Sequence, residues 1–117
     1  MMVQKTEQIM VCGDFNDVAM DMVAGTVDLI YTDPPYGRQD TIPSVEMLVD
    51  HAPRLLKDGG SLVTNVPHIL LEEVMAMFRE EEDRSKLKYR WIYNMDQEAG
   101  SRFCTTSSVL TLKGEDF

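Results

Sequence analysis

The segment VDLIYTDPPYG, residues 27–37, constrains the fold of this chain more than any other segment. Residues 27–32 are mostly apolar or β-branched without strict alternation, which is typical of a parallel strand buried on both faces. Pro34 and Pro35 then end the strand, because each proline fixes its own φ, lacks an N–H and keeps the preceding residue extended. The segment therefore predicts a buried strand that ends in a rigid, polar corner.

Strand and helix patterns alternate along the rest of the chain. We expect strands at residues 7–12, 27–32 and 61–66, with helices between them and a further helix over 68–85. The helix over 44–56 is expected to begin at Ser44 and to kink or break at Pro53. Two more strands, 88–95 and 107–114, lie close together in sequence. The 117 residues thus predict a single α/β domain, 1–117, with a mostly parallel sheet and an antiparallel strand pair at its C-terminal edge.

The net charge, the two cysteines and the lack of long apolar runs exclude several classes of protein. The net charge of −9 argues against a large basic surface for a phosphate backbone, although a local patch of Arg and Lys is compatible with it. Cys12 and Cys104 have no metal-ligand spacing and are expected to be buried free thiols, so we expect no metal site. We see no signal peptide and no apolar run of membrane-spanning length, which favours a cytoplasmic protein that does not bind a membrane.

The corner after residue 32 carries groups that suit one kind of chemistry. The Asp33 carboxylate and the Pro34 carbonyl are two acceptors for the two hydrogens of an exocyclic amino group, and Tyr36 offers a flat face for a planar ring. An aromatic amine is a poor nucleophile because its lone pair is delocalised into the ring. Two acceptors orient the amine and favour the pyramidal nitrogen that attacks a methyl sulfonium. The corner therefore suits methylation of an aromatic amine.

The same segment, with CGDFNDV before it (12–18) and APRLLKDGGSLVTNV after it (52–66), resembles the N6-adenine and N4-cytosine DNA methyltransferases, above all those of phages and prophages. The resemblance covers roughly residues 9–113. It implies a partial class I methyltransferase sheet, which is Rossmann-like. It also implies S-adenosylmethionine as cofactor, a flipped adenine in DNA as substrate, and a place in restriction-modification.

The resemblance also implies roles for single residues. Asp33, Pro34, Pro35 and Tyr36 match the catalytic motif, and an aspartate at its first position favours adenine N6 over cytosine N4. Asp33 and Asp14 would lie near the cofactor. For Asp14 a helix cap is an equally good interpretation.

Three more residues are candidates for substrate binding beside Tyr36. Asn65 lies near the end of the strand at 61–66 and His68 follows that strand, so both are expected at the same edge of the sheet as Asp33. Arg102 lies in a loop where it would meet a phosphate. A helix-start residue is the simpler interpretation of His68. Core packing, rather than base stacking, is the favoured interpretation of the aromatic residues of strand 88–95, which are Tyr89, Trp91 and Tyr93.

The family binds S-adenosylmethionine through a glycine-rich turn, and no Gly-x-Gly occurs in this sequence. We therefore expect the catalytic half of the fold without its cofactor turn, and weak or absent activity of the chain alone. Unpaired sheet edges would favour a homodimer or pairing with a complementary methyltransferase chain. Two alternatives stay open, a non-catalytic binding or assembly module derived from this fold and an RNA methyltransferase.

Overall fold

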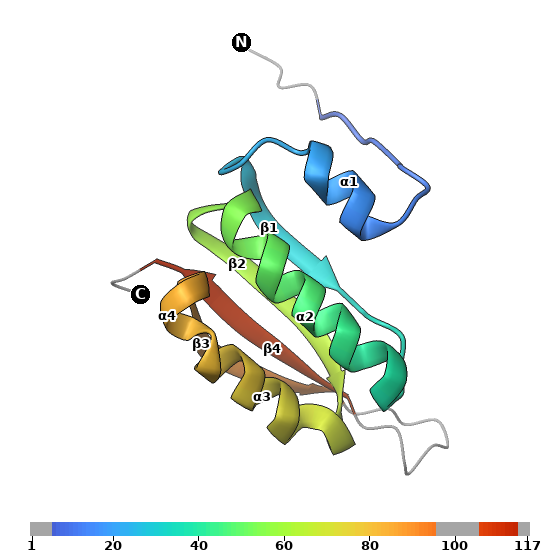
Figure 1. The fold of residues 1–117 in the computed structure, drawn as a ribbon, viewed down its shortest axis with the longest axis vertical. Coiled ribbons are helices and arrows are strands. Elements are labelled where there is room, and N and C mark those ends of the chain that lie inside the picture. The colour runs from blue at the N-terminus through green and yellow to red at the C-terminus, as the bar shows by residue number, and fades with distance from the viewer. Residues whose placement is uncertain (1–5, 96–105, 115–117) are drawn as a thin grey trace.

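The computed structural model describes residues 6–95 and 106–114, which form a four-stranded mixed sheet with helices on one face (Figure 1). The first half of the chain contains α1 (Phe15–Asp21), β1 (Val27–Thr32), α2 (Arg38–Leu55) and β2 (Leu56–Pro67). The second half contains the short 3-10 helix η1 (His68–Leu70), α3 (Leu71–Glu80), α4 (Glu82–Ser85), β3 (Leu87–Met95) and β4 (Thr106–Lys113).

The sheet has the strand order β1-β2-β4-β3. β1 and β2 are parallel, with Thr32 paired to Thr64, and the antiparallel pair of β3 and β4 confirms the prediction for the C-terminal strands. β4 also pairs antiparallel with β2. The prediction of a mostly parallel sheet is therefore wrong, because two of the three strand pairings are antiparallel.

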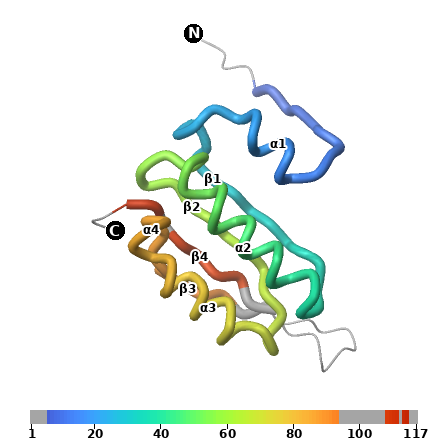
Figure 2. The backbone as a smooth tube through the Cα atoms, viewed as in Figure 1, coloured from blue at the N-terminus to red at the C-terminus, as the bar shows by residue number. Residues whose placement is uncertain are grey.

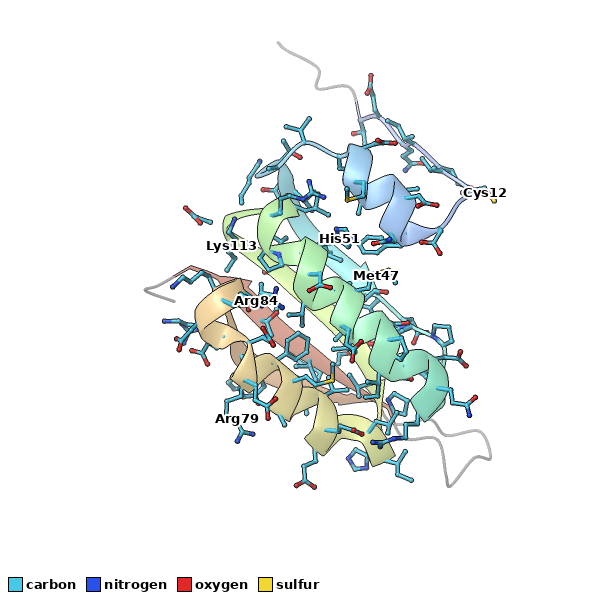
Figure 3. The ribbon with its side chains drawn as sticks, in the orientation of Figure 1. Cys12, Met47, His51, Arg79, Arg84 and Lys113 are labelled. Carbon is cyan, nitrogen blue, oxygen red and sulfur yellow. The ribbon has the colours of Figure 1, made fainter. Side chains whose placement is uncertain are left out.

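The expected strand at residues 7–12, which would have added a parallel pairing, is also absent. Residues 6–12 form no strand, and Ile9, Met10 and Val11 are 82%, 98% and 61% exposed. This segment leads into α1 and runs away from the sheet (Figure 2), and its Cys12 is exposed rather than buried (Figure 3). An apolar segment becomes a strand only beside a partner strand, and among the described residues β1 pairs with β2 alone.

The core lies between the sheet and the helices α2 and α3. The buried side chains come from α2, β2, α3 and the last two strands, and they include Val45, Leu48, Val49, Ala52, Leu62, Val66, Val74, Phe78 and Val109. None of the helices within residues 6–95 and 106–114 is long and apolar enough to cross a membrane.

α2 differs from its prediction at both prolines. It begins at Arg38 and continues through Pro43 and Pro53 without a break. Ser44 is therefore inside the helix, where its hydroxyl donates to the Asp40 carbonyl at 2.8 Å, instead of capping it. Burial of the apolar face of α2 outweighs the loss of two backbone donors.

Several side chains expected inside the protein lie outside it. Trp91 and Tyr93 of β3 are 59% and 53% exposed, and Tyr89 is 43% exposed, so core packing is the wrong interpretation of this strand. Ile69, expected on the inner face of the helix after β2, is 91% exposed. The helices cover one face of the sheet, and the sequence of β3 alone does not indicate which of its side chains lie on that face.

Candidate functional site

The proline corner follows β1 directly and leads into α2. Pro34 is buried, whereas Asp33 and Tyr36 are exposed, Tyr36 by 45%. Gly37 has a φ of +110°, a conformation that a residue with a side chain rarely adopts, and the next residue begins α2. Two prolines and a glycine thus turn the chain sharply from strand to helix at the carboxyl end of β1.

A buried hydroxyl holds the corner against the first turn of α2. Thr41 is fully buried, and its Oγ1 donates to the carbonyl oxygen of Pro35 at 2.7 Å. The Pro34 carbonyl accepts no hydrogen bond from any of the residues that the structure describes. Of the two proline carbonyls, that of Pro34 is therefore the one available to a ligand.

A cavity of about 330 Å³ opens beside the corner. It lies between β1, the corner and α2, and the start of α1 closes one side. The lining residues are Phe15, Ile30, Tyr31, Thr32, Asp33, Pro34, Pro35, Ser44, Met47 and Leu48. The lining combines aromatic and aliphatic side chains with one carboxylate, which suits a planar, largely apolar ring that carries a polar group.

α1 is fastened beside this cavity by two side chains of α2. His51 is buried, and its Nε2 lies 2.5 Å from Oδ1 of Asn16, while its ring meets the ring of Phe15 edge-on at 5.8 Å (Figure 3). Arg54 donates to the backbone carbonyls of Ala19 at 2.6 Å and Met22 at 2.9 Å. These contacts fix Phe15 where it lines the cavity.

The remaining predicted site residues that the structure describes do not line the cavity, and these include Tyr36, which is exposed on the corner beside it. Asp14 is the N-cap of α1, where its carboxylate accepts from the Asn16 backbone N–H at 2.8 Å, and it does not line the cavity. Asn65 is 5% exposed, and its Oδ1 accepts from the Ser108 hydroxyl at 2.6 Å. His68 is exposed at the start of η1, away from the lining. Arg102 lies outside the described residues.

An ion pair spans the entrance to α2. Arg38 donates from Nη1 and Nη2 to the two carboxylate oxygens of Glu73 at 2.5 and 2.6 Å, which ties the first residue of α2 to α3. Both side chains are solvent-accessible, so the pair contributes little to the stability of the fold.

Sequence reasoning missed several lining residues. Phe15 directly follows Asp14 in the segment that carries the resemblance, which was the one signal that pointed to it. Ser44, Met47 and Leu48 belong to a segment predicted only as a helix, and only the position of α2 over β1 brings them to the cavity. Within residues 6–95 and 106–114, no group of three or more His, Cys, Asp or Glu side chains is placed to hold a metal ion.

Comparison with known proteins gives structural matches only. No family model and no curated protein matches the sequence. The solved structures that match this chain include a protein of Thermus thermophilus, at a TM-score of 0.67 and 17% identity. That protein is assigned as a DNA modification methylase and was crystallised with S-adenosyl-L-methionine. The match covers 90% of this chain and 53% of that one. The cytosine-N4-specific PvuII DNA methyltransferase matches at a TM-score of 0.67 and 11% identity, over 87% of this chain and 48% of that one.

The fold therefore resembles part of a class I methyltransferase. A fibrillarin pre-rRNA processing protein of Methanococcus jannaschii also matches, at a TM-score of 0.56 and 19% identity, over 88% of this chain and 44% of that one. The chain thus spans about half the length of these proteins. At these identities the resemblance concerns the fold alone.

Proposed function

We propose that this chain is the catalytic portion of an S-adenosylmethionine-dependent DNA methyltransferase that acts on the N6 amino group of adenine. The observation that carries this proposal is the cavity beside Asp33 and Pro34 at the carboxyl end of β1. Ligands of open α/β sheets bind at this end of the strands. The proposal is also supported by the match to two DNA methyltransferase structures over 87–90% of the chain.

In this mechanism the corner holds the substrate amine. The Asp33 carboxylate and the Pro34 carbonyl accept the two amino hydrogens, and Tyr36, which is exposed beside the cavity rather than in its lining, would turn onto the flipped base to stack on it. S-adenosylmethionine supplies the methyl group when it is bound. As the methyl group is transferred the amino group would lose one proton, which Asp33 would accept or pass to water. Positioning of the amine carries most of the rate enhancement.

The described residues fit a base better than they fit the whole cofactor. A cavity of about 330 Å³ is at the small end of the range for ligand sites. The Asp14 carboxylate already caps α1, and the lining carries Asp33 as its one carboxylate. We therefore propose that much of the cofactor is held by further strands beside the free edge of β1. The exposed apolar residues 9–11 support this, since they are suited to a strand that lacks a neighbour.

A homodimer or a complementary methyltransferase chain would supply those strands. The test is transfer of a labelled methyl group from S-adenosylmethionine to duplex DNA, with Asp33→Ala as the inactive variant. Asp28→Ala, which removes an exposed carboxylate from the strand that precedes the corner, is the matched control. We expect weak or absent transfer by the purified chain and loss of any residual transfer in Asp33→Ala alone. Transfer that survives in Asp33→Ala would contradict the proposed role of the corner.

RNA is a second candidate substrate, which the match to the fibrillarin protein favours. The net charge of −9 does not distinguish the two nucleic acids. Replacement of the duplex by single-stranded DNA and RNA of the same sequence separates them. Faster transfer to RNA than to either DNA would assign RNA as the substrate. A chain that neither transfers methyl groups nor binds adenine would instead be a non-catalytic module of this fold.

A further inference from the structure

The surfaces on the two sides of α3 carry opposite charge. On the side of α2, a groove of about 360 Å³ is lined by four carboxylates and one guanidinium, which belong to Glu46, Asp50, Glu80, Glu81 and Arg84. On the side of β3, a cleft of about 360 Å³ is lined by three cations and one carboxylate, which belong to Arg79, Lys88, Arg90 and Glu82. Figure 3 shows Arg84 between α4 and α2, and Arg79 on the opposite side of α3. The chain has a net charge of −9, yet this second cleft is basic.

Two of the cations in this basic cleft have no role in holding the fold together. Three of the five arginines that the structure describes bind other groups of the protein, and these are Arg38, Arg54 and Arg84. Arg79 and Arg90 form neither an ion pair nor a hydrogen bond with any of the described residues. The chain has 20 acidic residues and 11 basic ones, so carboxylates are abundant. The two guanidiniums are therefore available to an anion that the chain does not supply.

A β-bulge turns one of these arginines toward the cleft. Tyr89 pairs with Thr111 of β4 and Trp91 pairs with Leu110, so Arg90 is an extra residue in β3. Successive side chains of a regular strand point to opposite faces, whereas Arg90 lines the same cleft as Tyr89. β3 is an edge strand of the described sheet, and bulges at sheet edges often re-aim a side chain. The bulge thus places a guanidinium beside an aromatic ring.

The aromatic ring in the cleft selects the kind of anion. Tyr89 is 43% exposed, and the same cleft is lined by Met75 and the buried Phe78 of α3. A partly exposed ring stacks on a planar base, and guanidiniums beside it hold a phosphate. An acidic peptide would pair with the cations but would leave the ring unused. A nucleotide uses both groups, which favours it as the ligand.

We propose that the cleft between α3 and β3 binds one nucleotide of a single-stranded nucleic acid, with its base on Tyr89 and its phosphate between Arg79 and Arg90. The volume of about 360 Å³ is at the small end of the range for ligand sites, which suits one nucleotide. Both arginines are exposed, so a strand has room to continue past the cleft. The proposal does not rest on methyl transfer, since it uses neither Asp33 nor the cofactor.

A thymidine oligomer tests the cleft alone, because thymine has no exocyclic amine for Asp33 to hold. The affinity of a fluorescently labelled single-stranded oligomer is measured by anisotropy at about 0.05 and about 0.2 M salt. Two phosphate contacts predict an affinity about sevenfold lower at the higher salt, from a slope of about −0.7 per contact for single strands. An abasic oligomer of the same length keeps the phosphates without the bases. It should bind at least about fivefold more weakly, because it cannot stack on Tyr89.

Charge variants locate the phosphate contact. Arg79→Gln and Arg90→Gln should each lower the affinity by about tenfold, since each removes a charge-assisted hydrogen bond. Each should also reduce the effect of salt from about sevenfold to about threefold, because one phosphate contact is lost. Lys57→Gln is the matched control. It removes the same charge from an exposed lysine outside the cleft and should bind like the wild type.

Two variants of Tyr89 test the stacking. Tyr89→Phe keeps the ring and should bind like the wild type. Tyr89→Thr keeps a good strand former without the ring, and it should lower the affinity by at least about fivefold. Since the arginine variants lie on exposed side chains, they test the same cleft if the threonine variant does not fold.

Four results would overturn the proposal. One is a lack of binding at the lower salt up to about 1 mM protein. Another is an affinity that neither arginine variant changes, which would place the contact elsewhere. The third is an abasic oligomer that binds as tightly as the thymidine oligomer, which would make the cleft a general anion site. The fourth is thymidine monophosphate that binds as tightly as the oligomer, which would assign the cleft to a free nucleotide. None of these results bears on methyl transfer to adenine, so the two proposals fail separately.

Discussion

Thr41 donates a hydrogen bond of 2.7 Å from its buried hydroxyl to the carbonyl of Pro35, and this contact joins the first turn of α2 to the corner after β1. The corner is therefore held by the helix that follows it as well as by its own prolines. Any ligand that uses Asp33 and the Pro34 carbonyl depends on that support, because catalytic groups must be held in place by their surroundings.

Removal of the Thr41 hydroxyl should loosen the corner. Thr41→Val keeps the volume of the side chain but leaves the Pro35 carbonyl without its donor, so we expect a loss of about 1–2 kcal/mol in the free energy of unfolding. Thr41→Ser keeps the hydroxyl and loses a methyl group. Urea unfolding measures both, and amide exchange of Tyr36 and Gly37 reports on the corner. Exchange there should accelerate in the valine variant alone; equal acceleration in both would show that packing, and not the hydrogen bond, holds the corner.

The contact of His51 with α1 should contribute measurably to the free energy of unfolding. His51→Ala removes the partner of Asn16 and the ring that meets Phe15, and we expect a loss of about 1–3 kcal/mol. Amides of α1 should lose protection against exchange before those of α2. His68→Ala, at an exposed histidine, is the control and should change stability by less than about 0.5 kcal/mol. Uniform loss of protection across the sheet would contradict local release of α1.

The Arg38–Glu73 pair should show measurable coupling despite its exposure. Its two parallel hydrogen bonds favour a coupling energy of about 0.5–1 kcal/mol in a double-mutant cycle with Arg38→Gln and Glu73→Gln. The pair between Lys57 and Asp28, a single contact of 3.2 Å, provides the comparison and should couple by less than about 0.3 kcal/mol. Coupling in the first pair that is no larger than in the second would mean that the bidentate geometry adds nothing.

Gly60 is required where β2 passes close to β1. A Cβ on Gly60 would lie 2.8 Å from the Lys57 carbonyl oxygen and 3.2 Å from that of Val27, so Gly60→Ala should cost about 1–3 kcal/mol. Gly13→Ala is the control, since its Cβ would meet only Val18 Cγ2, at 3.5 Å. Thermal unfolding distinguishes the two. A Gly60→Ala variant as stable as Gly13→Ala would show that the backbone there shifts freely.

The sequence predicts a structural feature well where that feature depends only on residues that are neighbours along the chain. The two prolines after Thr32 predicted the end of the strand, and the prediction that Asp14 could cap a helix is confirmed, because both features follow from local geometry. The C-terminal antiparallel pair was likewise predictable from two strands close in sequence.

The features that the sequence did not predict depend on contacts between residues that are distant in the sequence. Residues 7–12 have the pattern of a strand but no adjacent strand, and Trp91 has the pattern of a half-buried strand on a face that no helix covers. Pro53 predicted a break that the buried face of α2 overrides. The position of Phe15 at the cavity depends on His51, 36 positions later in the sequence (51 − 15 = 36), and no local pattern reports such a contact.

The central claim is that the corner holds an amino group, and titration of the isotopically labelled chain with adenosine and inosine tests it most directly by NMR. Inosine keeps the purine ring and the sugar but carries an oxygen in place of the amine. We predict that adenosine shifts the amides of Phe15, Asp33 and Ser44 and binds about tenfold more tightly than inosine. Asp33→Ala should remove that preference. Equal affinity for the two nucleosides, or shifts confined to residues away from the cavity, would contradict the account.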